Sequence, residues 1–215
     1  MNLIEIFFKG GFLMWVILGT SLIAVAIAVE KFMSLKKAKI NTPSFLMKMR
    51  NLLKKRDVAS AIALCMEEKT PTSNIIKKGL KKYKLGRERV IEAIDSAGRH
   101  EISKLERGLS TLATIAGAAP MLGFLGTVTG MIGAFMKIQE LQGAAGPADL
   151  AGGIWEALIT TAFGLFVGIP VLAVYNYLLS RVNKVVIDME MIAADIIDVL
   201  DDTQKGITEE IEEEL

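Results

Sequence analysis

Side chains that could do chemistry are scarce in the apolar parts of this sequence. Glu156 is the only charged residue between Leu150 and Ser180, and the hydroxyls of Thr127 and Thr161 lie in similarly apolar surroundings. A carboxylate inside a membrane span costs about 2.5 to 3.5 kcal/mol on insertion scales, and such residues tend to line ion paths or face a bundle interior. One hypothesis from this pattern is transfer of a proton or another ion across a membrane.

Purely structural roles for these residues stay open on the sequence alone. Residues 157–180 are long enough to cross a bilayer, so Glu156 could sit in the first turn of a helix, near its positive end. Threonine hydroxyls in membranes commonly bond to their own helix. The step from Glu156 to Thr161 turns a regular helix by about 140°, so one path touching both needs a neighbouring subunit or a helix distortion. Thr160 is the hydroxyl nearest to Glu156 on its own face.

Small residues surround both threonines at helical spacing. In lipid, helices associate by close packing, so small residues mark the surfaces that touch. A plot at 100° per residue places Thr127 on one stripe with small residues, and Thr161 on another. The predicted packing positions are Gly123, Gly126, Gly130, Gly164 and Gly168.

Three apolar runs must carry these residues. They are Gly10 to Val29, Gly108 to Met136 and Leu150 to Ser180, and each is long enough for a hydrocarbon core of about 30 Å. We assign the transmembrane helices to residues 10–33, 108–136 and 150–180. The result is an all-α membrane protein whose three transmembrane helices extend into a cytoplasmic helical bundle.

The basic residues predict the orientation. Of the 25 Lys and Arg residues, 20 lie between Lys31 and Arg107, and three of the other five follow the third span. The positive-inside rule places both segments in the cytoplasm. The N-terminus is then periplasmic and the C-terminus cytoplasmic, in a bacterial inner membrane.

The remaining segments complete this topology. Residues 1–9 form a short outer N-terminus, and residues 137–149 a short periplasmic loop. Residues 34–107 form a basic cytoplasmic region of packed helices, and residues 181–215 a cytoplasmic helix with an acidic tail. Since no proline interrupts Arg87 to Met136 before Pro120, the second span is expected to extend out of the membrane, on its N-terminal side, as one long helix.

The composition argues against several other classes of protein. One cysteine and one histidine allow neither an internal disulfide nor a structural zinc site. No nucleotide-binding motif is visible, and a net charge near +1 gives no sign of nucleic acid binding. We therefore expect no cofactor, no metal and no enzymatic activity.

Two segments resemble a known family. APMLGFLGTVTGMIGAF (Ala119 to Phe135) and GGIWEALITTAFGLFVGIPVLAVYNYL (Gly152 to Leu178) are similar to the second and third spans of ExbB and TolQ, relatives of the flagellar stator subunits. The resemblance is greatest to ExbB. It implies that Thr127 and Thr161 are pore threonines and that Glu156 is the intramembrane glutamate of the family.

The resemblance also implies partners. Family members form a homo-oligomeric ring, a pentamer in characterised cases, around a dimer of a single-span ExbD- or TolR-like protein, and act on a TonB- or TolA-like protein using the proton motive force. Two other hypotheses stay open. One is a non-conducting membrane scaffold whose basic cytoplasmic helices bind proteins or anionic lipids, and the other is an ion-driven stator for motility.

Overall fold

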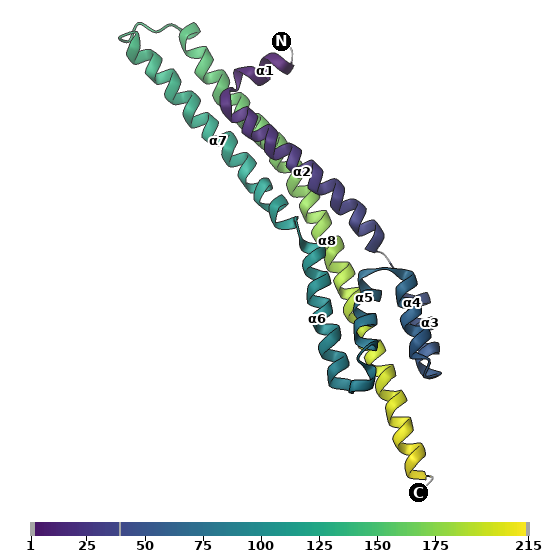
Figure 1. Ribbon diagram of the computed structural model, residues 1–215. Helices are drawn as coiled ribbons and strands as arrows, with labels where there is room; N and C mark the ends of the chain where they lie inside the picture. The colour runs from purple at the N-terminus through teal and green to yellow at the C-terminus, as the bar shows by residue number, and fades with distance from the viewer. Residues whose placement is uncertain (1–2, 39, 214–215) are drawn as a thin grey trace. The chain divides into compact units, whose positions relative to one another are not determined.

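The computed structural model describes residues 3–38 and 40–213, and all regular elements in these ranges are helices (Figure 1). In chain order they are α1 (Leu3–Lys9), α2 (Gly11–Ala38), α3 (Thr42–Lys54), α4 (Val58–Glu68), α5 (Pro71–Leu80), the 3-10 helix η1 (Tyr83–Leu85), α6 (Arg87–Glu106), α7 (Leu109–Glu140) and α8 (Pro147–Glu213). The expected all-α fold is confirmed.

Three helical stretches are long and apolar enough to cross a membrane: Gly11–Ala38, Arg87–Glu140 and Pro147–Asp202. The apolar part of the second stretch is α7, and that of the third is the first half of α8. The number of spans therefore agrees with the sequence prediction.

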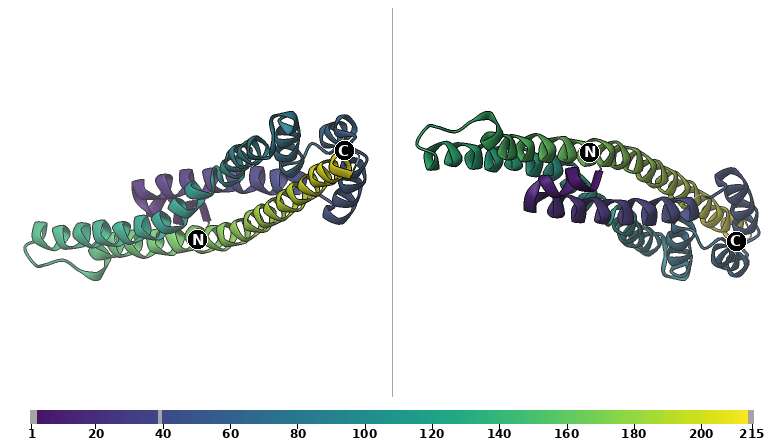
Figure 2. Two further views of the ribbon diagram at one scale, coloured as in Figure 1. Left: turned by 90° about the horizontal axis from the view of Figure 1, so that it is seen from below. Right: turned by 90° about the horizontal axis from the view of Figure 1, so that it is seen from above.

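The chain divides into two compact units. The first contains Met1–Lys31 and Gly108–Leu179, and so holds the apolar helices. Within it, α7 and α8 lie side by side as a hairpin in all the views (Figures 1 and 2). Large apolar side chains on the outside of this unit are exposed, among them Phe12, Phe124 and Phe166. That is the surface expected of helices whose solvent is lipid.

The second unit contains Phe32–Arg107 and Ser180–Leu215 and has a core of large side chains. In α3 the i, i+4 spacing of Phe45, Met49 and Leu53 brings all three to one buried face. The same unit buries Met189, Ile192 and Ile196 from α8. A salt bridge joins Arg50 to Asp195, with Arg50 Nε to Asp195 Oδ2 at 2.9 Å.

Helix boundaries in this unit follow ordinary capping chemistry. Asn41 and Asp57 accept hydrogen bonds from the backbone N–H groups of Ser44 and Ser60. Thr70 and Ser73 form a reciprocal capping box at the start of α5. Hydrogen bonds from the side chain and then the backbone N–H of Ser60 lower the pKa of Asp57. These caps satisfy N–H groups that the first turn of a helix leaves without partners.

One helix differs from the sequence prediction. The long helix expected from Arg87 through Met136 is interrupted, because α6 ends at Glu106 and Gly108 adopts a φ of +87° before α7 begins. A positive φ of this kind is readily adopted by glycine, which has no Cβ. The third span does continue as expected, because α8 is a single helix of 67 residues.

Candidate ion pathway between two apolar helices

The hydroxyls of Thr127 in α7 and Thr161 in α8 are joined by a hydrogen bond. The Oγ1 of Thr161 also donates to the carbonyl oxygen of Gly123 at 3.0 Å, and the Oγ1 of Thr127 lies 3.4 Å from the carbonyl oxygen of Ala157. Both threonines are partly exposed. The pair therefore forms a small polar spot that bridges two apolar helices and stays accessible at its edge.

Glycines make this contact possible. A Cβ atom on Gly123 would lie 2.8 Å from the carbonyl oxygen of Thr160 and 3.0 Å from Cα of Thr161, and one on Gly164 would lie 2.6 Å from the carbonyl oxygen of Ala119. These neighbours are backbone atoms, which cannot rotate aside. The two helices thus touch backbone to backbone at the level of the threonines.

The same close approach continues above and below the pair. A Cβ on Gly130 would lie 2.5 Å from the carbonyl oxygen of Gly153, and one on Gly168 would lie 2.5 Å from Cγ of Pro120. Gly126 faces the side chain of Thr160, whose Oγ1 would be 2.2 Å from an added Cβ. All five predicted packing glycines therefore lie along this line of contact, which we call the α7–α8 seam.

Thr160 has a different role from its neighbour Thr161. Its side chain is fully buried, and its hydroxyl donates within α8 to the carbonyl oxygens of Glu156 at 2.7 Å and Ala157 at 3.1 Å. A hydroxyl satisfied in this way fills the space left by Gly126 and is not free to guide an ion.

Glu156 does not join the threonine pair. Its carboxylate lies against the start of α2, where a Cβ on Gly11 would be 2.6 Å from Oε1. The structure thus brings two of the three predicted pathway residues together and places the third on another face of α8, consistent with the angular separation expected for a regular helix.

Sequence reasoning missed several contacts of this unit. Gly153 lies four residues before Ala157 in the same small-residue stripe, so the spacing rule that selected Gly164 would have found it. The contact between Gly11 and Glu156 joins residues far apart in the chain, and no periodicity signals it. Among residues whose side chains are described, no group of three or more His, Cys, Asp or Glu could hold a metal ion.

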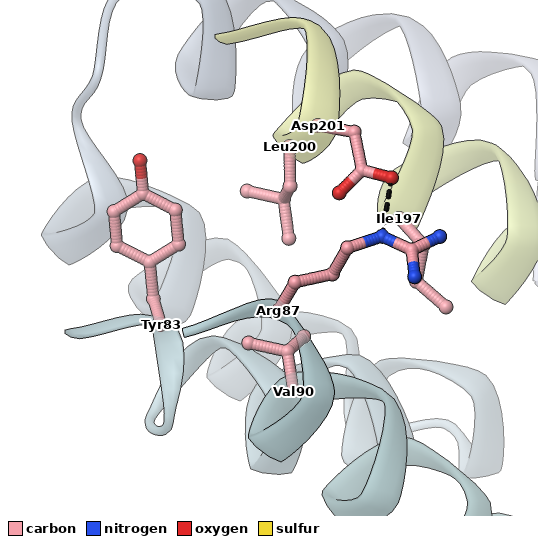
Figure 3. A pocket seen from close by; sticks show the side chains of 6 residues that line it. All are labelled: Tyr83, Arg87, Val90, Ile197, Leu200 and Asp201. Atoms are coloured by element: carbon pink, nitrogen blue, oxygen red, sulfur yellow. Dashed lines mark hydrogen bonds and ion pairs between the residues drawn. The ribbon is translucent and has the colours of Figure 1, made fainter. Parts of the chain in front are cut away.

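The described residues of the second unit contain a larger groove and a small cavity. The groove, of about 390 Å³, lies between α5, α6 and α8, and its lining includes Asp95, Arg99 and Glu190. The small cavity measures about 10 Å³, which suits one water molecule. Figure 3 shows the residues that line it, with the salt bridge of 2.5 Å between Arg87 Nε and Asp201 Oδ2. Neither space is lined by a predicted pathway residue, so the seam remains the candidate site.

Comparison with known families decides the affiliation of the chain. The model of the MotA/TolQ/ExbB proton channel family matches residues 67–191, which include the whole seam. The chain belongs to the MotA/TolQ/ExbB family. Together with its three apolar helices, this makes it a multi-pass membrane protein.

Individual relatives agree with the family assignment. An ExbB homologue of Methanothermobacter thermautotrophicus, named as a biopolymer transport protein, is 33% identical over 192 residues, which are 89% of this chain and 68% of the relative. The biopolymer transport protein ExbB of Xanthomonas campestris is 46% identical over 101 residues, 46% of this chain and 38% of that protein. The Tol-Pal system protein TolQ of Haemophilus influenzae is 42% identical over 95 residues, 44% of this chain and 41% of that protein. The matches to these last two relatives thus span well under half of their length.

Proposed function

We propose that this chain is the channel-forming subunit of an ion-driven complex of the inner membrane, of the ExbB-ExbD-TonB or TolQ-TolR-TolA type. In this proposal it transmits the proton motive force to a partner and catalyses no covalent reaction. The observation that carries the proposal is the Thr127–Thr161 pair, a polar spot held between two otherwise apolar helices. The names of its ExbB and TolQ relatives support the same assignment.

The exposure of this pair indicates what surrounds it. Thr127 and Thr161 are partly exposed, and the seam brings them to an edge of the α7–α8 hairpin. In a ring of identical chains, likewise part of this proposal, such edges face a central space. A dimer of a single-span partner with an acidic residue would fill it and carry the ion past the hydroxyls. Each elementary charge crossing a potential of 100 mV supplies about 2.3 kcal/mol, so several ions suffice for a mechanical step.

The direct test is ion flux in lipid vesicles that contain this chain and the small single-span protein expected from a neighbouring gene. Thr127→Val and Thr161→Val keep the shape of the side chain and remove the hydroxyl, so each should lower proton flux by about tenfold or more. Thr129→Val is the matched control, because the hydroxyl of Thr129 bonds to two carbonyls of its own helix, those of Leu125 and Gly126. Repeating the measurement with a sodium gradient identifies the ion.

Equal flux in the wild type and both seam variants would refute the assigned pathway.

A second candidate function, a non-conducting scaffold, is favoured by one observation. Lys78, Lys81, Lys82 and Lys84 are all exposed around the α5–η1 turn, where they could bind an acidic protein surface. The scaffold predicts no flux in any variant and loss of partner binding when these four lysines are replaced by glutamine.

A further inference from the structure

The carboxylate of Glu156 is seated against the sharp corner between α1 and α2. Gly11 opens α2 with a φ of +68°, a conformation that L side chains rarely adopt. A Cβ on Gly11 would lie 2.6 Å from Oε1 and 3.1 Å from Cδ of Glu156. The positive φ therefore favours glycine at position 11. The contact with the carboxylate leaves no room for a side chain there unless Glu156 moves.

The corner is a packed structure. The rings of Phe7 and Trp15 meet edge to face with centroids 5.0 Å apart, which fixes α1 against the second turn of α2. The Nζ of Lys9 lies 5.7 Å from the ring centroid of Trp155, the residue just before Glu156. Contacts from both sides thus hold α1, α2 and α8 together around the carboxylate.

Two contacts give the depth of Glu156 along the spans. Gly11 meets Glu156 at one end of α2, and an added Cβ on Gly108 would lie 3.6 Å from Cε of Lys31 at the other. About 20 residues of α2 separate these levels, or about 30 Å, the thickness of a hydrocarbon core. Trp15 and Trp155 lie near the Glu156 end, where tryptophans gather at membrane interfaces. Glu156 therefore lies level with the N-terminal end of α2, and Thr161 lies about 7.5 Å further along α8.

We propose that Gly11 is a positioning residue for Glu156. The α1–α2 corner holds the carboxylate level with the N-terminal end of α2, on a face of α8 away from the threonine pair, so an ion entering from that end meets Glu156 before Thr127 and Thr161. The N-terminal end of α2 supplies partial positive charge beside the carboxylate. This assignment rests on the proposed function and adds an entry station to its pathway.

The test compares Gly11→Ala with Gly19→Ala in the full chain, purified with its single-span partner and placed in lipid vesicles. Gly19 belongs to the same helix, but a Cβ there would meet nothing within 4 Å. The first readout is the rate at which a carbodiimide labels Glu156, followed by mass spectrometry. Gly11→Ala pushes the carboxylate out from under the corner, so labelling should be faster by about threefold or more. Gly19→Ala should label at the wild-type rate.

The second readout is the pH profile of ion flux, which would not change if Gly11 had a purely structural role. Gly11→Ala should shift the midpoint of this profile. The shift should vanish when Glu156→Ala is also present, because the carboxylate that the new methyl group displaces is then missing. Glu156→Asp withdraws the carboxylate by one methylene without altering Gly11. Glu156→Asp should also shift the pH profile of ion flux. This variant tests the proposal if the Gly11→Ala protein does not accumulate.

Labelling rates and pH profiles of Gly11→Ala that match those of Gly19→Ala would overturn the assignment, as would an unshifted profile for Glu156→Asp. Failure of the proposed function looks different. In that case the wild type shows no partner-dependent flux, while the labelling comparison still reports whether the corner holds the carboxylate.

Discussion

The two units of this chain pack through side chains of different size. Along the α7–α8 seam, glycines let two backbones touch, whereas the second unit is filled by large side chains such as Phe45, Met49 and Ile76. In water, burial of apolar surface drives packing, so large side chains are favoured in the core. In lipid that drive is absent, and close van der Waals contact between small residues takes its place. One sequence therefore follows two packing rules, and each should fail under a different kind of substitution.

The largest effect is expected from shrinking a side chain in the second unit. Phe45→Ala removes a ring whose residue is only 1% exposed and should lower the free energy of unfolding by about 3 to 5 kcal/mol. Denaturant titration of the full chain in detergent, followed by circular dichroism, measures the loss. Met47→Ala is the control, because Met47 lies on the exposed face of the same helix. Equal losses for both variants would contradict the core assignment.

The seam should fail when a side chain grows. Gly123→Ala adds one methyl group against the backbone of Thr160 and Thr161, at a cost of about 1 to 3 kcal/mol. Gly133→Ala adds the same methyl to the same helix where nothing lies within 4 Å. The thermal midpoint in detergent should fall for Gly123→Ala and stay unchanged or rise slightly for Gly133→Ala, because alanine favours the helix over glycine. An equal fall in both variants would contradict the contact assignment.

The smallest expected effect concerns Cys65, which is buried in the second unit. Burial raises the pKa of its thiol to about 12 from the ordinary value of 9.0. Between these values the unfolded chain releases the proton and the folded chain keeps it, so stability should decline as pH rises from about 9 to about 12. Cys65→Ala should lack this part of the decline in denaturant titrations at pH 8 and pH 10. Rapid reaction of the folded wild type with a maleimide at pH 8 would contradict burial of the thiol.

The seam was more predictable than its surroundings. Helical spacing alone selected the stripes that contain Gly123, Thr127 and Gly164, because lipid-facing and helix-facing residues differ in size. Spacing gives the face of a helix but not its partner, so the contact of Gly126 with Thr160 could not be foreseen. The neighbour of Glu156 was hidden for the same reason, since Gly11 is remote in sequence.

The break between α6 and α7 was harder to predict than the continuation of α8. The interruption at Gly108 depends on a backbone angle that a glycine permits but does not impose, and a single sequence does not display it. The sequence did predict that the third span extends into a helical bundle. In agreement with that prediction, Met189, Ile192 and Ile196 of α8 are buried in the second unit.

The seat of Thr160 has a mechanical consequence. Its side chain fills the hollow left by Gly126, with backbone contacts on either side at Gly123 and Gly130. Rotation of α8 about its own axis would bring the side chain of Thr160 into a steric clash with the main chain of α7. Under the proposed function, a movement of α8 would therefore carry the whole α7–α8 hairpin, and the hydroxyls of Thr127 and Thr161 would stay next to each other.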